Sequence, residues 1–393
     1  MSELEQLLKK YAPSGSELRE LGSILGYEQP TKYIVHSSIY KNSNVTPVLT
    51  AGKTFILGYT NETDGIYTAS KESPVMIFDD FTTSFHWVDF SFKVKSSAMK
   101  ILKPLDDAVL FRFVYYAMKS IDYKPSDHVR HWISQYSKIK IPVPALEIQK
   151  KIVEILDTFS GLEADLSEQL NLEISTRHAQ FTYYRDLLIT GNKHSTPTDL
   201  GKLGTFKRGG GIQKKDFTPE GVGCIHYGQV FTYYGTYATE TKSYISVEQA
   251  AKSRKANTGD LVIATTSEND DDVCKAVAWL GDEDIAVSGD ALIFKHDQNP
   301  RFMSYFFQTT SFSDQKRRFI TGTKVRRVSP QNLSKISISI PDLAEQERVA
   351  NLLESFEKLT ADNAEMLHAE KKTRQKQYSH YRNKLISLAE LKV

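Results

Sequence analysis

A gap-free internal repeat constrains this chain more than any other feature of its sequence. Residues 141–190 align with residues 338–387, and nineteen positions are identical, whereas unrelated chains of ordinary composition match at about one position in fifteen. Pro144 aligns with Pro341, and Gln149 aligns with Gln346. The repeat predicts a chain made of two related halves rather than two domains that carry unrelated surface helices.

Each copy of the repeat has the periodicity of one long helix. Asp342 and Glu345 follow Pro341 in the pattern of a helix-starting capping box, and Gly191 follows the first copy as a stop. We expect helices of about 45 residues, roughly 65–70 Å long at 1.5 Å per residue. The apolar stripe along a helix of that length, its seam, must pack against another long element. The other copy, running antiparallel, fits best. In the first copy the seam positions recur near every third or fourth residue, at Leu156, Phe159, Leu166, Leu170 and Tyr184.

A weaker similarity precedes each helix and suggests the domain layout. Residues 18–25 (LRELGSIL) resemble residues 200–207 (LGKLGTFK) at an offset of 182. We expect an α+β fold in which two α/β domains, each a twisted sheet with helices, are separated by two long antiparallel coiled-coil helices in a pseudo-two-fold arrangement. The predicted parts are a first domain at 1–142, a central spacer helix at 143–192, a second domain at 193–340 and a C-terminal spacer helix at 341–393.

Short strands and a few helices are expected inside each domain. Helices are predicted at residues 109–121 and 300–312, which occupy equivalent places in the two halves. Segments rich in β-branched and aromatic residues, bounded by Gly, Asp and Ser, predict strands. These segments are residues 74–81, 86–95, 259–267, 275–281 and 290–296.

Local charge, more than net charge, indicates a nucleic-acid partner. The formal net charge is only +2, which neither demands nor excludes such a partner. Basic residues gather within residues 92–103, 201–215 and 315–327, among glycine, serine and threonine. Loops of this composition can contact phosphates through Lys, Arg and backbone amides. For any single cluster, a solvated surface is an equally good interpretation. Two different domains on a rigid spacer would suit a DNA target with two separated halves.

Candidate DNA contacts come from these clusters and from polar turns at predicted strand ends. Arg suits guanine, and Asn or Gln suits adenine, but loop contacts follow no code, so the recognised bases and the gap between half-sites stay open. The candidate DNA-binding residues are Lys53, Thr54, Thr82, Thr83, Lys93, Lys95, Arg130, Lys207, Arg208, Lys214, Lys215, Thr265, Thr266, Ser267, Lys324, Arg326 and Arg327.

Signatures of catalysis are missing from the sequence. Residues 51–54 (AGKT) resemble the end of a phosphate-binding loop, but Pro47 stands where the first glycine is required. No Pro-Pro-aromatic motif of adenine methyltransferases occurs, and Cys224 and Cys274 lack metal-type spacing. We therefore expect no catalytic residue and no metal site. The N-terminus has no apolar run of signal-peptide type and no window reaches membrane-spanning length, so a cytoplasmic protein is expected.

The repeated segments resemble those of a known family. Each has the pattern P-x-L-x-x-Q-x-x-(I/V)-x-x-(I/L)-L-x-x-F and closes near an aromatic-x-x-Y-R-x-x-L pattern. This looks like the specificity (S) subunit of type I DNA restriction–modification systems, and residues 27–35, 47–67, 77–83 and 87–100 resemble the first recognition domain of type IC members. The resemblance rests on Pro144, Leu146, Gln149, Ile152, Leu156, Phe159, Phe181, Tyr184, Arg185 and Leu188, and on Pro341, Leu343, Gln346, Val349, Leu353, Phe356, Tyr378, Tyr381, Arg382 and Leu385.

The resemblance implies a non-catalytic reader of DNA. Each target-recognition domain would read one half of a bipartite, asymmetric site in double-stranded DNA, and the helices would set the gap and dock two methyltransferase (modification) subunits. Restriction/translocase subunits would join in the full complex. S-adenosylmethionine, ATP and Mg are expected on those partner subunits, and no cofactor in this chain. The residues expected to pair the helices and dock subunits are Leu156, Phe159, Leu162, Tyr184, Arg185, Leu353, Phe356, Leu359, Tyr381 and Arg382.

Two other functions remain open. A fused restriction or methylation enzyme with a disguised active site would bind S-adenosylmethionine or cut DNA by itself. A two-headed scaffold that does not bind DNA would space two protein-binding modules. Salt-dependent binding to duplex DNA separates that scaffold from a DNA reader, because phosphate contacts make affinity fall steeply with salt.

Overall fold

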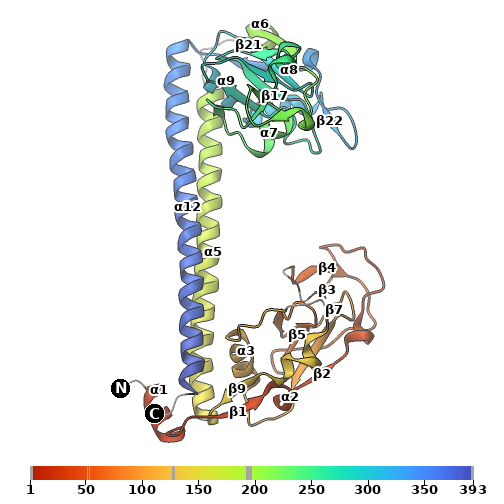
Figure 1. The fold of residues 1–393 in the computed structure, drawn as a ribbon, viewed down its shortest axis with the longest axis vertical. Helices are drawn as coiled ribbons and strands as arrows, with labels where there is room; N and C mark the ends of the chain where they lie inside the picture. Colours follow the sequence, from red (N-terminus) through yellow and green to blue (C-terminus); the bar gives the residue numbers. More distant parts are fainter. Residues whose placement is uncertain (1–2, 51, 53, 126–128, 192–196, 391–393) are drawn as a thin grey trace. The chain divides into compact units, whose positions relative to one another are not determined.

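The computed structural model describes residues 3–50, 52, 54–125, 129–191 and 197–390. The chain forms two compact units, residues 1–169 with 369–393 and residues 170–368. Both units contain part of the two long helices, α5 (Leu146–Thr190) and α12 (Leu343–Leu388), which Figure 1 labels. We call residues 17–143 of the first unit head 1 and residues 197–339 of the second unit head 2.

The two long helices confirm the helical interpretation of the repeat. α5 has 45 residues and α12 has 46. At the start of α12, the Asp342 carboxylate accepts a hydrogen bond from the backbone N–H of Glu345 over 2.8 Å. At the end of α5, the Gly191 N–H donates to the carbonyl oxygen of Leu187 over 2.8 Å. A Cβ on Gly191 would lie 2.3 Å from that oxygen, so α5 can end in this way only on glycine.

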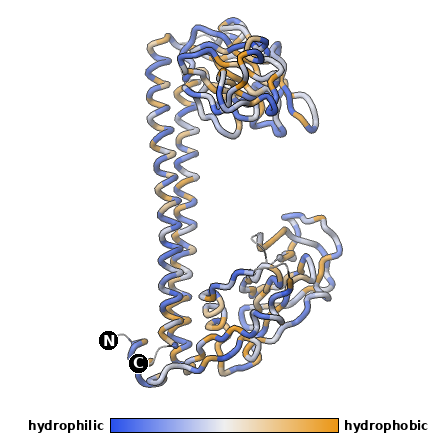
Figure 2. Tube along the Cα trace, viewed as in Figure 1, coloured by the Kyte–Doolittle hydropathy of each residue, from blue (hydrophilic) through white to orange (hydrophobic). Residues whose placement is uncertain are grey.

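Within each unit the parts of α5 and α12 lie side by side and run antiparallel (Figure 1). In the first unit, the hydroxyl oxygens of Ser160 and Tyr378 are 2.7 Å apart. In the second unit, the rings of Phe181 and Phe356 meet edge to face with centroids 5.6 Å apart. Hydrophilic and hydrophobic positions alternate along both helices, as Figure 2 shows. The predicted antiparallel pairing is thus confirmed inside each unit.

Two sheets of more than two strands lie in the described part of head 1. One has the strand order β2-β8-β5-β6 with antiparallel pairing throughout, and the other has the order β4-β3-β7 with β3 and β7 parallel. The strands are β2 (Leu25–Glu28), β3 (Thr46–Leu49), β4 (Ile56–Thr60), β5 (Val75–Asp79), β6 (Phe85–Val88), β7 (Lys93–Val94) and β8 (Met99–Pro104). The helices of this unit before α5 are α1 (Glu3–Tyr11), α2 (Leu21–Ile24), η1 (Pro30–Tyr33), α3 (Phe111–Lys119), α4 (His131–Ser134) and η2 (Tyr136–Lys138).

Head 2 contains two larger sheets. Their strand orders are β11-β21-β17-β19-β14 and β12-β15-β13-β20-β16. The strands are β11 (Gly204–Arg208), β12 (Phe217–Thr218), β13 (Val222–Ile225), β14 (Tyr237–Ala238), β15 (Ser243–Ile245), β16 (Lys255–Ala256), β17 (Leu261–Ala264), β19 (Ala276–Trp279), β20 (Ile285–Val287) and β21 (Ala291–His296). The helices are α6 (Leu200–Leu203), η3 (Lys214–Asp216), α7 (Tyr227–Thr232), α8 (Val247–Ala251), α9 (Pro300–Phe306), α10 (Thr310–Arg317) and α11 (Pro330–Leu333).

The expected helices at equivalent places in the two heads are α3 and α9. The segment 300–312, predicted as one helix, holds α9 and the start of α10. Asn299 caps α9 by accepting from the Phe302 N–H, and Thr309 caps α10 by accepting from the Phe312 N–H. Because Thr309 is an N-cap, the chain starts a new helix there instead of continuing the old one.

Each head begins and ends at one antiparallel strand pair. β1 (Glu17–Glu20) pairs with β9 (Lys140–Val143), and β10 (Pro197–Asp199) pairs with β23 (Ser337–Ser339). The strand that enters a head therefore lies against the strand that leaves it for the long helix, and both heads start and end in the same way.

The similarity in front of the long helices is real, but its predicted register is wrong by three residues. A Cβ on Gly22 would lie 3.1 Å from Cβ of Ser137, and one on Gly201 would lie 2.9 Å from Cβ of Ser334. Ser137 and Ser334 are equivalent in the repeat, so Gly22 corresponds to Gly201 rather than to Gly204. The true offset is 179 residues, which joins the short helices α2 and α6.

The core of each head continues into the long helices. In the first unit, Phe113 and Trp132 of head 1 share a buried cluster with Ile148 and Leu156 of α5 and Ile386 of α12. In the second unit, the corresponding cluster joins head 2 to both helices, through Phe294, Phe302, Ile189, Val349 and Leu353. Burying such side chains stabilises by roughly 1.5–3 kcal/mol each. Each head is therefore one folding body with its own part of the helices.

Candidate nucleic-acid interface and helical groove

A short antiparallel strand pair in head 2 brings two candidate segments together. β18 (Thr266–Ser267) pairs with β22 (Arg326–Arg327), so that Thr266 lies opposite Arg327 and Ser267 lies opposite Arg326. These segments are far apart in the sequence, and each was selected there separately. The fold therefore places polar residues of one segment and basic residues of the other side by side on one surface.

Two grooves flank this strand pair. One, of about 710 Å³, is lined by residues that include Lys214, Ser267 and Val325. The other, of about 300 Å³, is lined by residues that include Arg208 and Arg327. Thr266 lines both grooves. A concave polar surface beside several cations can accept phosphate groups and the edges of bases.

The cations of this surface are partly held by the protein itself. The Arg208 guanidinium donates to the carbonyl oxygen of Gly289 over 2.7 Å, and the Arg326 guanidinium lies 2.8 Å from the Asp270 carboxylate. These contacts position the two arginines without neutralising the whole surface. The remaining candidate cations of head 2 have exposed side chains: Lys207, Lys214, Lys215, Lys324 and Arg327.

The hydroxyl candidates of head 2 serve the fold first. Thr265 Oγ1 donates to the Asp290 carbonyl oxygen over 3.1 Å, and Thr266 Oγ1 lies 3.5 Å from the Asp290 carboxylate. Thr266 is buried and Ser267 is half-buried. The Thr266 side chain thus stabilises the end of β17 and the start of β18, and its contact with DNA stays a prediction.

A buried lysine that was not among the candidate DNA-binding residues stabilises a loop beside this surface. The Lys316 ammonium donates to the carbonyl oxygens of Asp271 and Val273 over 2.7 and 2.8 Å. Burial lowers the pKa of Lys316, and the nearby Cys274 and Asp271 oppose that shift. Lys316 thus fixes the acidic loop whose Asp272 lines the larger groove.

Sequence reasoning missed several residues that line the same groove. Among them are Tyr227 and Gln229 of α7 and the exposed Lys242. Gln229 closes a helix cap with His226 and donates to Ser243 Oγ over 2.7 Å. The His226-to-Gln229 spacing could have predicted that cap, but no local signal predicts that α7 borders the loop after β17. Only the folded sheet brings them together.

In head 1, one turn fastens two candidate segments to each other. Asp80 accepts hydrogen bonds from the backbone N–H groups of His131 and Trp132, over 2.8 and 2.9 Å. Its buried carboxylate lies 3.1 Å from the Lys100 ammonium. This holds the exposed Arg130 beside the turn that follows β5, where Thr82 is exposed.

Thr83, in the same turn, has an unusual backbone conformation. Its φ is +58°, a region that β-branched residues rarely adopt. Its side chain is buried and donates to the carbonyl oxygen of Thr82 over 2.7 Å. Thr83 therefore shapes the turn, and Thr82 is the residue that the turn presents.

Lys93 was wrongly predicted as a surface contact. Its side chain is fully buried, its ammonium lies 2.8 Å from the Glu62 carboxylate, and it donates to the Asp64 carbonyl oxygen over 2.7 Å. Lys95 and Thr54 are exposed. Lys53 lies outside the described residues.

The same lysine accounts for a group of side chains with metal-ligand spacing. Ligand atoms of His36, Glu62 and Asp64 lie within 4.8 Å of one another. The Lys93 ammonium lies 4.0 Å from Asp64 in addition to its contact with Glu62. An internal cation therefore already lies beside these carboxylates, and the absence of a metal from this chain stays a prediction.

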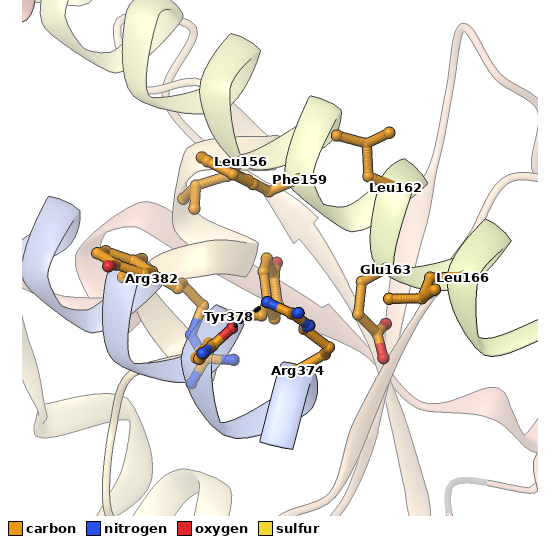
Figure 3. A pocket seen from close by; sticks show the side chains of 10 residues that line it. Leu156, Phe159, Leu162, Glu163, Leu166, Arg374, Tyr378 and Arg382 are labelled. Atoms are coloured by element: carbon orange, nitrogen blue, oxygen red, sulfur yellow. Dashed lines mark hydrogen bonds between the residues drawn. The ribbon is translucent and has the colours of Figure 1, made fainter. Parts of the chain in front are cut away.

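The helix residues selected from the repeat have two different roles. Leu156 and Leu353 are fully buried in the cores that join each head to its helices. By contrast, an apolar groove of about 210 Å³ opens on the surface of the first unit between α5 and α12 (Figure 3). Its lining includes Phe159, Leu162 and Tyr381, which are exposed, and Arg382, which is half-buried. An exposed apolar groove of this kind is suited to bind another protein.

Several of the equivalent residues of the second unit contact other side chains of the protein. The Phe356 ring contacts the rings of Phe181 and Tyr184. Arg185 is buried and pairs with Asp186 over 2.8 Å. The Asp186 carboxylate also accepts from the backbone N–H of Thr310 over 3.1 Å. Arg185 therefore helps to hold head 2 on α5, and Tyr184 and Leu359 are the candidates here with exposed side chains.

Comparison with known proteins places these features in one family. The chain matches the family described as "Type I restriction modification DNA specificity domain" over residues 13–176 and 196–370. It is 36% identical over 400 aligned positions to the EcoR124I/EcoR124II type I restriction enzyme specificity subunit of Escherichia coli, with 98% of each chain covered. The chain belongs to the type I restriction–modification DNA specificity family.

Two further matches have lower sequence identity. A putative type I restriction enzyme specificity subunit of Haemophilus influenzae is 24% identical over 293 positions, with 71% of this chain and 72% of that protein covered. A solved structure of a type I R-M system chain superposes with a TM-score of 0.67 at 14% identity, covering 95% of this chain and 98% of the other. That structural likeness supports the fold of this specificity protein.

Among the described residues of the specificity protein, no helix combines the length and apolar character that crossing a membrane would require.

Proposed function

We propose that this chain is the DNA-reading subunit of a type I restriction–modification complex, with one half of a split, asymmetric site read by each head. The observation that carries the proposal is that the family match occurs twice, once over residues 13–176 and once over 196–370, so each half is a specificity domain. The heads differ in their sheets and surfaces. Two different readers in one chain suit a target whose halves differ in sequence.

The polar surface around β18 and β22 is our proposed reading surface of head 2. Exposed Lys214, Lys324 and Arg327 would bind phosphates, and the larger groove would receive base edges. In head 1 we propose the turn with Thr82 and the adjacent Arg130. Cytoplasmic DNA would be the substrate of the complex.

The helical groove of the first unit is our proposed docking surface for a methyltransferase subunit. The exposed surface of Phe159, Leu162 and Tyr381 is apolar, and its removal from water on binding would be favourable. We propose that two methyltransferase subunits and the restriction/translocase subunits assemble around the chain. S-adenosylmethionine, ATP and Mg would bind on those partners.

In this proposal the chain itself carries out no chemical step. Its two cysteines are poor nucleophiles, because burial raises the pKa of Cys224 to about 11 and that of Cys274 to about 12. The sequence motifs of methyltransferases and phosphate-binding loops also do not occur.

Mapping methylated adenines in DNA modified by the assembled complex tests the proposal. We expect methylation within a motif of two fixed halves separated by a gap of constant length and free sequence. A continuous motif, or no motif, would contradict the proposal. The purified chain alone is expected neither to bind S-adenosylmethionine nor to cut DNA, and either activity would favour a fused enzyme. Absence of salt-dependent duplex binding by the complex would favour a protein scaffold.

A further inference from the structure

A buried glutamine connects each head to the start of its long helix. In the first unit, Gln149 Oε1 accepts from the backbone N–H of Leu110 over 2.8 Å, and its Nε2 donates to the Pro144 carbonyl oxygen over 2.8 Å. Leu110 directly precedes α3, and Pro144 lies two residues before the start of α5. One side-chain amide thus joins the beginnings of both helices.

The second unit repeats this connection. Gln346 Oε1 accepts from the backbone N–H of Asn299 over 2.9 Å, and its Nε2 donates to the Pro341 carbonyl oxygen over 2.8 Å. Both glutamines are almost fully buried. A buried amide with all these bonds made has one preferred geometry, because any rotation leaves polar groups unsatisfied.

A second set of contacts, farther along the long helix, prevents head 2 from pivoting about Gln346. Arg301 of α9 forms ion pairs with two carboxylates of α12, Glu347 at 2.6 Å and Glu354. Glu357 lies ten residues beyond Glu347 on α12, nearly three helical turns. It accepts from the Tyr305 hydroxyl over 2.7 Å and from Thr236 Oγ1 over 3.1 Å. Head 2 is thus attached to α12 at several successive points.

Head 1 uses equivalent residues with fewer charges. Arg112 of α3 pairs with Asp157 of α5 over 2.8 Å, and the Tyr116 hydroxyl donates to the same carboxylate. Ser160 lies 3.1 Å from the Tyr116 hydroxyl and 2.7 Å from that of Tyr378, which belongs to α12. The attachment of head 1 therefore reaches both long helices through a chain of hydroxyl groups.

We propose that these junctions, whose residues are not among those that line the two grooves beside β18 and β22, determine the gap length that the chain accepts between the two halves of its DNA site. This inference rests on the proposed function. One extra base pair moves a half-site by about 3.4 Å and rotates it by roughly 34–36°. A head fixed at two points on its helix cannot follow that movement, whereas a head that pivots can. Arg301 is accordingly a positioning residue for spacing, with no contact to DNA required.

The test compares DNA duplexes that carry the mapped site with its natural gap, or with the gap one base pair shorter or longer. The complex with its methyltransferase subunits is assembled with the natural chain, with Arg301→Met, with Arg301→Lys and with Glu173→Gln. Glu173→Gln is the matched control, because the ion pair of Glu173 is with Arg177 along α5, in an exposed i,i+4 contact. The measured quantity is the ratio of affinities for the natural and altered gaps.

Arg301→Met is expected to lower this ratio on the order of tenfold, comparable with the effect of one mismatched base pair. Arg301→Lys, which can retain one of the two ion pairs, should give an intermediate ratio, and Glu173→Gln should leave it unchanged. A uniform loss of affinity with an unchanged ratio would show that Arg301 is merely structural and would overturn the inference. If the Arg301→Met variant does not assemble, the Arg301→Lys variant takes its place. A lowered ratio then supports the inference, and an unchanged ratio overturns it. Failure of the natural complex to prefer a split site would instead overturn the proposed function.

Discussion

The side-chain oxygen of Gln346 on α12 accepts the backbone N–H of Asn299, the residue that caps α9 of head 2, over 2.9 Å. This single contact joins the start of a head helix to the start of a 46-residue helix. Gln149 makes the same contact to Leu110 in the first unit. The glutamine of the repeated sequence pattern is therefore explained by the junction that it stabilises in each unit.

Replacing Gln346 by Leu should destabilise the protein. The substitution leaves the Asn299 N–H and the Pro341 carbonyl oxygen buried without this partner, which should lower the free energy of unfolding by about 2–4 kcal/mol. Gln375→Leu, at an exposed position of α12, is the matched control and should change it by less than about 0.5 kcal/mol. Denaturant unfolding of the two variants measures the difference. Equal stabilities would show that the buried amide is dispensable.

Glu62 should give head 1 a stability that depends on pH. Although burial tends to raise it, the pKa of Glu62 falls from 4.5 to about 2, because the Lys93 ammonium and the N–H groups of Ser37 and His36 favour the carboxylate. Since the folded pKa lies below the unfolded one, the stabilisation is complete above about pH 4.5 and is lost as the pH falls towards 2.

The Glu62→Gln variant tests this pH dependence. At neutral pH it should be less stable than the natural chain, and the difference in unfolding free energy should shrink between about pH 4.5 and 2. Unfolding curves at pH 7, 4 and 3 measure it. A difference that stays constant over this range would contradict the role assigned to Glu62.

The long helices were predictable because their signal is local and repeated. Gly191 had to be glycine at the end of α5, and Asp342 caps α12 through a contact three residues away. The short similarity before each helix was harder to align. Residues 200–204 contain Leu-Gly twice, and only the contact of Gly201 with Ser334 identifies which pair corresponds to Leu21-Gly22.

The candidate DNA surface was less predictable, since it depends on contacts between distant segments. Lys93 lies in a cluster of lysines, and nothing local reveals that Glu62 draws its ammonium into the interior. Conversely, the pairing of Ser267 with Arg326 could not be read from either segment. Lys242 was missed because it lies outside the basic clusters and reaches the groove only through the fold.

Arg327 should contribute to DNA binding mainly through charge. Replacing it by Gln should weaken binding of the assembled complex and reduce the slope of log affinity against log salt by about 0.9. Lys9→Gln, at an exposed position of α1, removes the same charge away from head 2 and should leave the slope unchanged. Titrations at several salt concentrations measure both. Equal slopes in all three complexes would exclude a phosphate contact at Arg327.

The groove between α5 and α12 in the first unit should be needed for assembly with a methyltransferase subunit. Leu162, which lines it, is 59% exposed, and Leu172, elsewhere on α5, is 65% exposed. Because both are exposed, changing either to Lys should leave the unfolding free energy within about 0.5 kcal/mol. Leu162→Lys should weaken co-purification with the methyltransferase subunit, and Leu172→Lys should not. If both variants assemble normally, the docking surface lies elsewhere.

The central claim is that each head reads one half of the site while its junction preserves the gap. Its most direct test is adenine-methylation mapping after residues 200–337 are exchanged for those of another family member, with both long helices and the junction residues Asn299, Arg301 and Tyr305 kept as they are. The account predicts that one half of the motif changes while the other half and the gap length stay the same. A change in both halves would contradict it.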